Sequence, residues 1–131
     1  MVIVDTHVFI WDLMDTNKIP AKILKHLDLV QEQGSLFICS ISLWEIGLLV
    51  GKGRIELDRP VDQFLKVGLL KRNYQLLEIT PEISLEVSIM AEEVNKDPAD
   101  RIIAASSLAH KAILITADKN LRSNKNLKTL W

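Results

Sequence analysis

The sequence opens with MVIVDTHVFI (residues 1–10), and this stretch decides how the rest of the chain is interpreted. Residues 2–4 form a short apolar run, which is long enough only for a buried strand. Asp5 follows that run directly, and a second apolar segment predicts a helix over 7–14. A buried strand that passes straight into a helix is typical of proteins with a parallel sheet.

The same alternation continues to the end of the chain. Further strands are predicted at 36–39, 76–79, 112–115 and 127–131, and further helices at 20–33, 43–51, 61–71, 81–94 and 98–110. This order predicts an α/β fold, an α/β/α sandwich with a mainly parallel central sheet of four to five strands. In such folds the functional site lies outside the carboxyl ends of the strands.

Length and composition favour one ordinary globular domain over residues 1–131. Apolar residues make up 48% and charged residues 25%, which excludes a disordered chain, a collagen and a coiled coil. No uncharged apolar stretch of about 18 residues occurs, so no membrane span is expected. No secretory signal is recognisable, and Cys39 is the one cysteine, so a cytoplasmic protein without disulfides is expected.

The charge balance limits how the chain could bind nucleic acid. The net charge is −1 and the isoelectric point is about 6.3. A wholly basic nucleic-acid binder usually lies above an isoelectric point of about 9. Any contact with nucleic acid must therefore come from a local basic patch.

Four acids occupy connections at the edge of the sheet where the site is expected. Asp5 and Asp118 follow predicted strands, whereas Glu45 and Asp100 lie near the starts of predicted helices. Like charges gathered at one edge repel each other unless a cation neutralises them. Carboxylate oxygens are hard ligands that suit Mg²⁺ or Mn²⁺.

Helix capping is an alternative explanation for the same acids. Ser42-x-x-Glu45 has the spacing of a capping box, and Asp97-Pro98-x-Asp100 resembles a helix N-terminus. The other two acids are suited to capping the turns that follow them. The residue pattern alone leaves both a metal site and a set of caps open.

At these residues the sequence resembles the PIN-domain ribonucleases of the VapC type, the toxins of toxin–antitoxin pairs. The matching segments are VIVDTHVFIWDL (2–13), SISLWEIGLLVGKGRIEL (40–57) and DPADRIIAASSLAHKAILITADKNL (97–121). The resemblance extends from Met1 to about Leu127 and includes order, spacing and local sequence. It implies a PIN-like nuclease fold for the whole chain.

The resemblance implies an acidic site that binds one or two Mg²⁺ or Mn²⁺ ions. Asp5, Asp100 and Asp118 would be direct or water-mediated ligands, and Glu45 would bind through water or orient the attacking water. Asp97 would be a helix cap and not a ligand. Supporting small hydroxyl residues would be Thr6, Ser40 and Thr116.

The resemblance also implies the reaction and the partners. The reaction would be metal-dependent hydrolysis of RNA, with the 3′-oxygen as leaving group and a 5′-phosphate as product. An antitoxin would occupy an apolar groove, and a homodimer is expected. Residues 7–14 and 43–50 hold more apolar side chains than one buried helix face requires, which fits either such a groove or burial on two sides.

Two groups of basic residues are candidates for RNA backbone contacts. They are Lys52 and Arg54 after one predicted helix, and Lys119 and Arg122 beside Asp118. Solvated surface explains them equally simply. Aromatic residues make up only 5% of the chain, so no base-stacking platform is expected.

Other functions remain as alternatives. A signalling receiver would need an acidic pair after the first strand, but Thr6 follows Asp5. A phosphatase of the Asp-x-Asp type is excluded because position 7 is His. An RNA-processing PIN nuclease that is not a toxin, and a catalytically inactive PIN-fold binding module, both stay open.

Overall fold

The computed structural model describes residues 1–91 and 97–131, and within them it shows one parallel sheet. Its strands are β1 (Val2–Val4), β2 (Leu36–Cys39), β3 (Gln75–Leu77), β4 (Ile113–Ile115) and β5 (Lys128–Leu130). The strand order is β3-β2-β1-β4-β5, and every neighbouring pair is parallel. The predicted parallel sheet is therefore confirmed, with five strands in the described residues.

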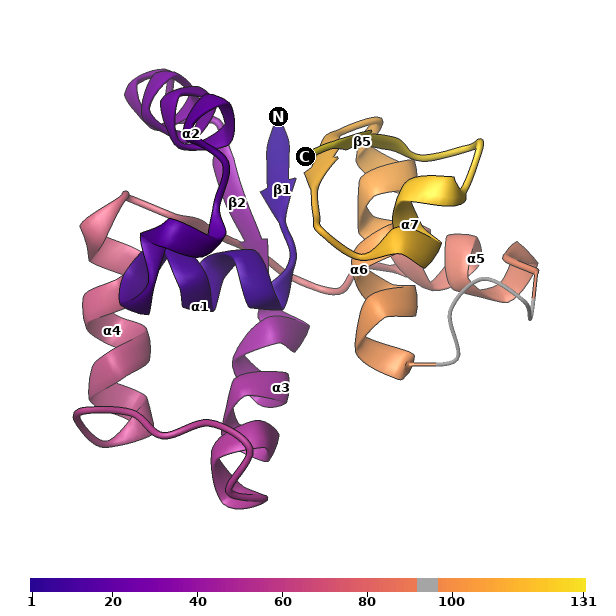
Figure 1. The fold of residues 1–131 in the computed structure, drawn as a ribbon. Helices are drawn as coiled ribbons and strands as arrows, with labels where there is room; N and C mark the ends of the chain where they lie inside the picture. The colour runs from indigo at the N-terminus through magenta and orange to yellow at the C-terminus, as the bar shows by residue number, and fades with distance from the viewer. Residues whose placement is uncertain (92–96) are drawn as a thin grey trace.

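Helices cover both faces of the sheet. They are α1 (Thr6–Met14), α2 (Ala21–Glu32), α3 (Ser40–Gly51), α4 (Val61–Lys71), α5 (Pro81–Ile89), α6 (Pro98–His110) and α7 (Lys119–Ser123), with a 3-10 turn at Thr16–Lys18. Figure 1 shows α1, α2 and α4 on one side of β1, and α5, α6 and α7 on the other. None of the helices in the described parts of the chain combines the length and apolar character needed to cross a membrane.

The alternation of side chains along β1 produces two apolar cores. Val2 and Val4 pack with Phe9 and other residues of the helices on one face. Ile3 packs on the opposite face, in a cluster that contains Ile103 of α6. Successive residues of a strand point to opposite faces, so a central strand covered on both sides must be apolar throughout.

Some predicted boundaries differ from the structure. The helix expected over 43–51 begins earlier, at Ser40, because Cys39 has the extended backbone of an N-cap residue. The helix expected over 81–94 ends at Ile89, and part of that predicted range lies outside the described residues. The short helix α7 was not predicted, because five residues are too few for a recognisable period.

An arginine of α6 contacts the backbone directly after the end of α5. Met90 has extended backbone dihedral angles and cannot continue the helix. Arg101 of α6 donates hydrogen bonds to the carbonyl oxygens of Met90 (3.3 Å) and Ala91 (3.1 Å). The guanidinium therefore satisfies backbone acceptors that the helix has left without intrahelical partners.

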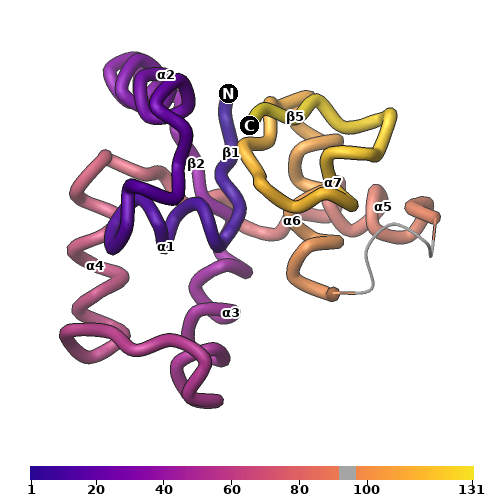
Figure 2. Tube along the Cα trace, in the orientation of Figure 1, coloured from indigo at the N-terminus to yellow at the C-terminus, as the bar shows by residue number. Residues whose placement is uncertain are grey.

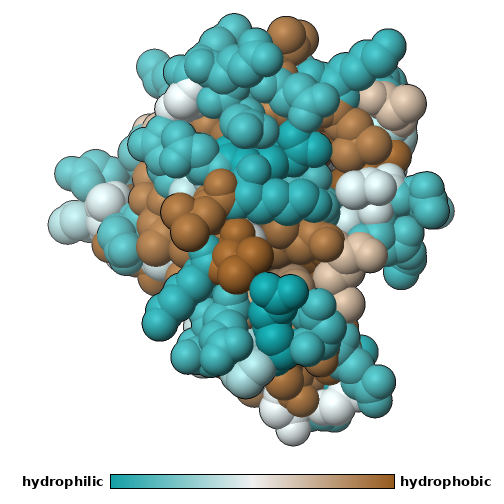
Figure 3. Space-filling model, turned by 90° about the vertical axis from the view of Figure 1, so that its left-hand side faces the viewer, coloured by the Kyte–Doolittle hydropathy of each residue, from teal (hydrophilic) through white to brown (hydrophobic). Residues whose placement is uncertain are grey.

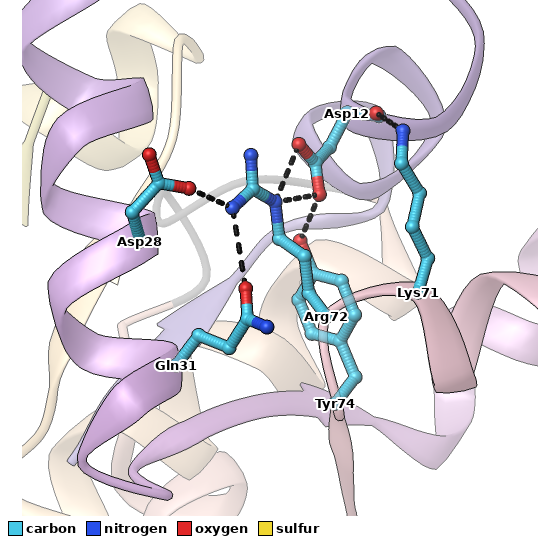
Figure 4. A network of polar contacts seen from close by, with 6 residues as sticks. All are labelled: Asp12, Asp28, Gln31, Lys71, Arg72 and Tyr74. Atoms are coloured by element: carbon cyan, nitrogen blue, oxygen red, sulfur yellow. Dashed lines mark hydrogen bonds and ion pairs between the residues drawn. The ribbon is translucent and has the colours of Figure 1, made fainter.

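A polar network joins α1 and α2 to the end of α4 and the start of β3 (Figure 4). The fully buried carboxylate of Asp12 accepts hydrogen bonds from Arg72 Nε (2.6 and 2.8 Å) and from the Tyr74 hydroxyl (2.9 Å). Arg72 also pairs with Asp28 of α2, and Lys71 donates to the Asp12 carbonyl oxygen (2.9 Å). The buried acid is thus both charge-paired and hydrogen-bonded.

Candidate active site

The site lies at the carboxyl edge of the three middle strands. β1 lies between β2 and β4, so the residues that follow these strands meet at one edge. Asp5 follows β1, α3 begins directly after β2, and Thr116 follows β4. The Cα trace in Figure 2 passes from β1 into α1 and from β2 into α3 at the same end of the sheet.

Asp5 is held in the middle of this edge. It is the N-cap of α1, where its Oδ1 accepts a hydrogen bond from the Val8 amide (2.8 Å), and only 6% of the residue is exposed. The Thr116 hydroxyl donates to its second oxygen. Burial raises the pKa of Asp5, although these two hydrogen bonds act in the opposite direction.

Thr116 also connects Asp5 to Asp118. Its hydroxyl oxygen accepts a hydrogen bond from the Asp118 amide (3.0 Å). Asp118 in turn caps α7, since its Oδ1 accepts from the Leu121 amide (2.9 Å). Asp5 and Asp118 are therefore helix caps, as the capping alternative proposed. Capping occupies one oxygen of each carboxylate, so the two roles are compatible.

Glu45 projects to the same edge from the second turn of α3. Its residue is 9% exposed, and its Oε1 is buried without a hydrogen-bond partner among the described residues. Burial raises the pKa of Glu45; the Thr6 hydroxyl lowers it, and the Asp97 charge raises it further. A buried carboxylate oxygen that lacks a donor costs free energy unless a cation or water satisfies it.

The capping-box prediction for Ser42 and Glu45 is wrong. Ser42 lies inside α3, and its buried hydroxyl accepts a hydrogen bond from the Thr6 hydroxyl (2.9 Å). This bond fixes α1 against α3 directly beside Glu45. Sequence reasoning named Ser40 as a supporting hydroxyl, but Ser42 is the residue that contacts Thr6.

Asp97 and Asp100 approach the site from the first turn of α6. Asp97 is the predicted N-cap, and its Oδ1 accepts from the amides of Ala99 (2.8 Å) and Asp100 (3.3 Å). One carboxylate oxygen from each of Glu45, Asp97 and Asp100 lies within 4.8 Å of the others. Asp97 was expected only as a cap, although its three-residue spacing from Asp100 already placed both at the start of one helix.

We call Asp5, Glu45, Asp97, Asp100 and Asp118 the acidic cluster. Burial raises the pKa of Asp100 to about 7, and the charges of the other four members raise it too, with Asp97 and Glu45 acting most strongly. Four carboxylates at the starts of three helices (α1, α6 and α7) and one inside α3 therefore affect one another electrostatically. The sequence prediction that separate acids share one edge is consistent with this coupling.

The acidic cluster has the chemistry of a site for a hard divalent cation. Carboxylate oxygens are the ligands that Mg²⁺ and Mn²⁺ prefer. The buried Oε1 of Glu45 offers an unused acceptor, and burial together with the charges of four other carboxylates raises the pKa of Asp100. Both observations fit a cation that these side chains would hold.

His7 lies beside the cluster on the first turn of α1. Its side chain is exposed, and its charge lowers the pKa of both Asp5 and Glu45. The His7 ring is 5.9 Å from the Trp11 ring.

The four candidate RNA-contacting residues lie in two clefts. Lys119 and Arg122 of α7 line one of them together with Trp131. Lys52 and Arg54 line another, whose wall includes the cluster members Glu45 and Asp97. The second cleft therefore opens directly onto the acidic cluster.

The family follows from a comparison with known domains. The model of the PIN domain matches residues 2–127 of the sequence. The chain belongs to the PIN domain family. Among curated proteins, this PIN domain is similar to Ribonuclease VapC22 from Mycobacterium tuberculosis (strain ATCC 25618 / H37Rv). The two are 28% identical over 135 residues, which cover 99% of this chain and 98% of the relative.

Solved structures share the PIN fold. A chain in the crystal structure of VapBC2 from Rickettsia felis, bound to a promoter DNA fragment, superposes with a TM-score of 0.74 at 20% identity, covering 99% of this chain and 98% of that one. A chain of DNA-bound VapBC from Salmonella typhimurium gives a TM-score of 0.71 at 18% identity, with 98% and 96% covered. At these identities the likeness establishes the fold.

Proposed function

We propose that this protein is a metal-dependent endoribonuclease and the toxin of a toxin–antitoxin pair. The observation that carries the proposal is the acidic cluster at the carboxyl edge of a PIN domain. The name of the similar ribonuclease and the complexes in which the similar folds were crystallised support it.

In this proposal the chain's own residues position the reaction. Asp5, Asp100 and Asp118 hold one or two Mg²⁺ or Mn²⁺ ions, and Thr116 keeps Asp5 and Asp118 in place through its two hydrogen bonds. Glu45 binds through water or orients the attacking water with its unpaired Oε1. The ion, when bound, supplies hydroxide near neutral pH and neutralises charge on the phosphate.

RNA is the proposed substrate, and an antitoxin is the proposed protein partner. The side chains of Lys52, Arg54, Lys119 and Arg122 would contact the RNA backbone near the cluster. The expected homodimer is retained as a prediction.

A groove between α1 and α4 is the proposed docking site for the antitoxin. Its apolar lining comes from Leu13, Met14, Phe64, Val67 and Gly68, and the charged residues Asp58, Arg59 and Lys71 also line it. A Cβ atom at Gly68 would lie 2.5 Å from Leu13 Cδ1, so glycine permits the close approach of these helices. Figure 3 shows apolar residues gathered in the middle of the side of the molecule on which α4 lies in Figure 1.

This groove involves fewer of the surplus apolar residues than the sequence suggested. Val8, Phe9 and Ile46 are buried in the core, so double-sided burial accounts for them. Met14 at the end of α1 is 48% exposed and remains available for a partner. The groove draws its other wall from α4, which the sequence did not indicate.

The first experiment is a cleavage assay on total RNA with antitoxin-free protein. We expect discrete fragments with 5′-phosphates in Mn²⁺ or Mg²⁺, and none in EDTA. Asp100→Asn should abolish cleavage, because Asn removes a charged ligand but keeps the shape of the side chain. Asp62→Asn, an exposed acid in α4, is the matched control and should cut normally. Cleavage by Asp100→Asn, or in EDTA, would contradict the proposal.

A growth assay separates a toxin from an RNA-processing nuclease. Expression of the native chain should arrest growth, whereas Asp100→Asn should not. Coexpression of a small protein encoded beside this gene should relieve the arrest. A cleaving protein that cells tolerate without a partner would instead be a processing enzyme.

A further inference from the structure

A cleft beside the acidic cluster carries an aromatic ring in addition to its two cations. The cleft is lined by residues of α3, of the turn after α3 and of the start of α6, namely Trp44, Glu45, Leu48, Leu49, Lys52, Arg54, Asp97 and Pro98. Glu45 and Asp97 belong to the acidic cluster, so the cleft and the proposed reaction site share a wall. A ligand that fills the cleft would lie next to the acidic cluster.

Trp44 is placed to present its ring in this cleft. It precedes Glu45 on α3, and 55% of it is exposed. Leu48 follows one helical turn later on the same face and is 38% exposed. An exposed tryptophan flanked by an exposed leucine offers a flat apolar surface that the protein core does not use.

The charges of the cleft indicate which ligand matches this surface. Lys52 and Arg54 are both exposed, follow the end of α3 and line the same cleft as Glu45 and Asp97. A purely apolar protein segment would leave these two cations without anions. A nucleotide has both complementary parts, since its base stacks on an aromatic ring and its phosphate pairs with Lys or Arg.

We propose that Trp44 stacks on the base of an unpaired nucleotide adjacent to the phosphate that the acidic cluster cleaves. Lys52 and Arg54 contact the phosphates on that side of the scissile bond. This inference rests on the proposed ribonuclease function and deepens it, because a base can reach the ring only in a single-stranded segment. The substrate is therefore cut in loops or other unpaired regions.

This assignment revises the expectation drawn from composition. Aromatic residues are only 5% of the chain, which argued against a stacking platform. A subsite for one base needs one ring in the right place, and overall aromatic content says nothing about placement. Trp44 was grouped with the surplus apolar residues of its helix because its exposure could not be read from the sequence.

Binding of short oligoribonucleotides tests the proposal without relying on cleavage. Oligo(A) and an abasic oligomer of equal length are titrated in EDTA, and gels confirm that the strands stay intact. The native chain should bind oligo(A) more tightly than the abasic strand, with quenching of tryptophan fluorescence. Trp44→Ala should bind oligo(A) at least about 5-fold more weakly, which matches the lower bound for stacking of one base. Trp44→Phe should recover most of the affinity.

The salt dependence separates stacking from charge pairing. Arg54→Ala should reduce the magnitude of the slope of log association constant against log salt concentration by about 0.7, as expected for one lost phosphate contact with a single strand. Trp44→Ala should leave that slope unchanged while lowering the affinity. Leu85→Ala, which removes a 61% exposed leucine on α5, is the control and should change neither quantity.

The outcomes distinguish this inference from the proposed function. If the protein cleaves RNA but Trp44→Ala binds and cleaves like the native chain, the base subsite is wrong and the nuclease assignment stands. If Trp44→Ala keeps its RNA affinity but changes the oligomeric state of the protein or weakens its complex with the antitoxin, Trp44 contacts protein and not RNA. Loss of discrimination between oligo(A) and the abasic strand in Trp44→Ala alone supports the proposal.

Discussion

Two buried aspartates at opposite ends of α1 have contrasting surroundings. Asp12 has no exposed surface and is paired with Arg72 and hydrogen-bonded to Tyr74. Asp5 is 6% exposed, and burial raises its pKa, with a smaller contribution from the charge of a second carboxylate, Asp118. The same residue type on one helix is thus neutralised by the protein at one end and gathered with like charges at the other.

The contrast separates an acid that the fold itself neutralises from one that we propose to be functional. A buried charge is tolerated when the fold supplies an opposite charge beside it. Removal of that partner is then strongly destabilising. Burial of several like charges is tolerated only at a cost, which a bound cation can offset. Arg72 supplies the counter-charge for Asp12, and we propose that Mg²⁺ or Mn²⁺ supplies it for Asp5.

The largest expected effect is a loss of stability when Asp12 loses its partner Arg72. Arg72→Ala should lower the free energy of unfolding by about 3–5 kcal/mol, because Asp12 would remain buried without its partner. Urea denaturation measures this change. Arg59→Ala breaks an exposed ion pair with Asp58 and should cost less than about 1 kcal/mol. Equal losses in the two variants would mean that the network does not stabilise the fold.

The next largest effect is stabilisation of the fold by a cation bound at the acidic cluster. Mn²⁺ at 100 times its dissociation constant should raise the free energy of unfolding of the native chain by about 2.7 kcal/mol. Asp100→Asn should lose most of this gain, whereas Asp62→Asn should keep it. A thermal melt with and without Mn²⁺ measures both, and an unchanged melt of the native chain would argue against a cation site.

Removal of one acid should stabilise the metal-free protein. Asp100→Asn deletes a charge that lies among four other carboxylates, so we expect a gain of roughly 1 kcal/mol at pH 8 in EDTA. The same variant should lose cleavage activity, which is the signature of a functional acid. Destabilisation by Asp100→Asn would instead show that favourable interactions of Asp100 outweigh the repulsion within the acidic cluster.

The smallest effect is a dependence of stability on pH. The pKa of Asp100 is raised from 3.8 to about 7, so the folded chain binds its proton more tightly than the unfolded chain. Its destabilising contribution is complete above pH 7, shrinks as the pH falls through 7, and disappears below 3.8.

We therefore expect the metal-free native chain to be more stable at pH 6 than at pH 8, by less than about 1 kcal/mol after allowance for solvent screening. The raised pKa values of Asp5 and Glu45 act in the same direction. Asp100→Asn should show a smaller difference between the two pH values. An identical difference in both proteins would assign the effect to other groups.

The sequence was sufficient to predict the parallel sheet and four of the five members of the acidic cluster. Strand and helix periods are local properties, and the rule for parallel sheets then places Asp5, Glu45, Asp100 and Asp118 at one edge. Asp97 was correctly predicted to be the N-cap of α6. Its closeness to Glu45, however, depends on how α6 packs against α3. No local sequence pattern predicts how these two helices pack.

What the sequence determined by itself is the order of buried strands and helices and the acids that end them, because burial patterns and caps involve neighbours within a few residues. Only the tertiary structure decided that Arg72 reaches Asp12 across 60 positions and that Thr116 holds Asp5 across 111. It alone showed that Trp44 remains exposed beside Glu45. These contacts depend on the packing of distant segments, which many sequences with the same local pattern would arrange differently.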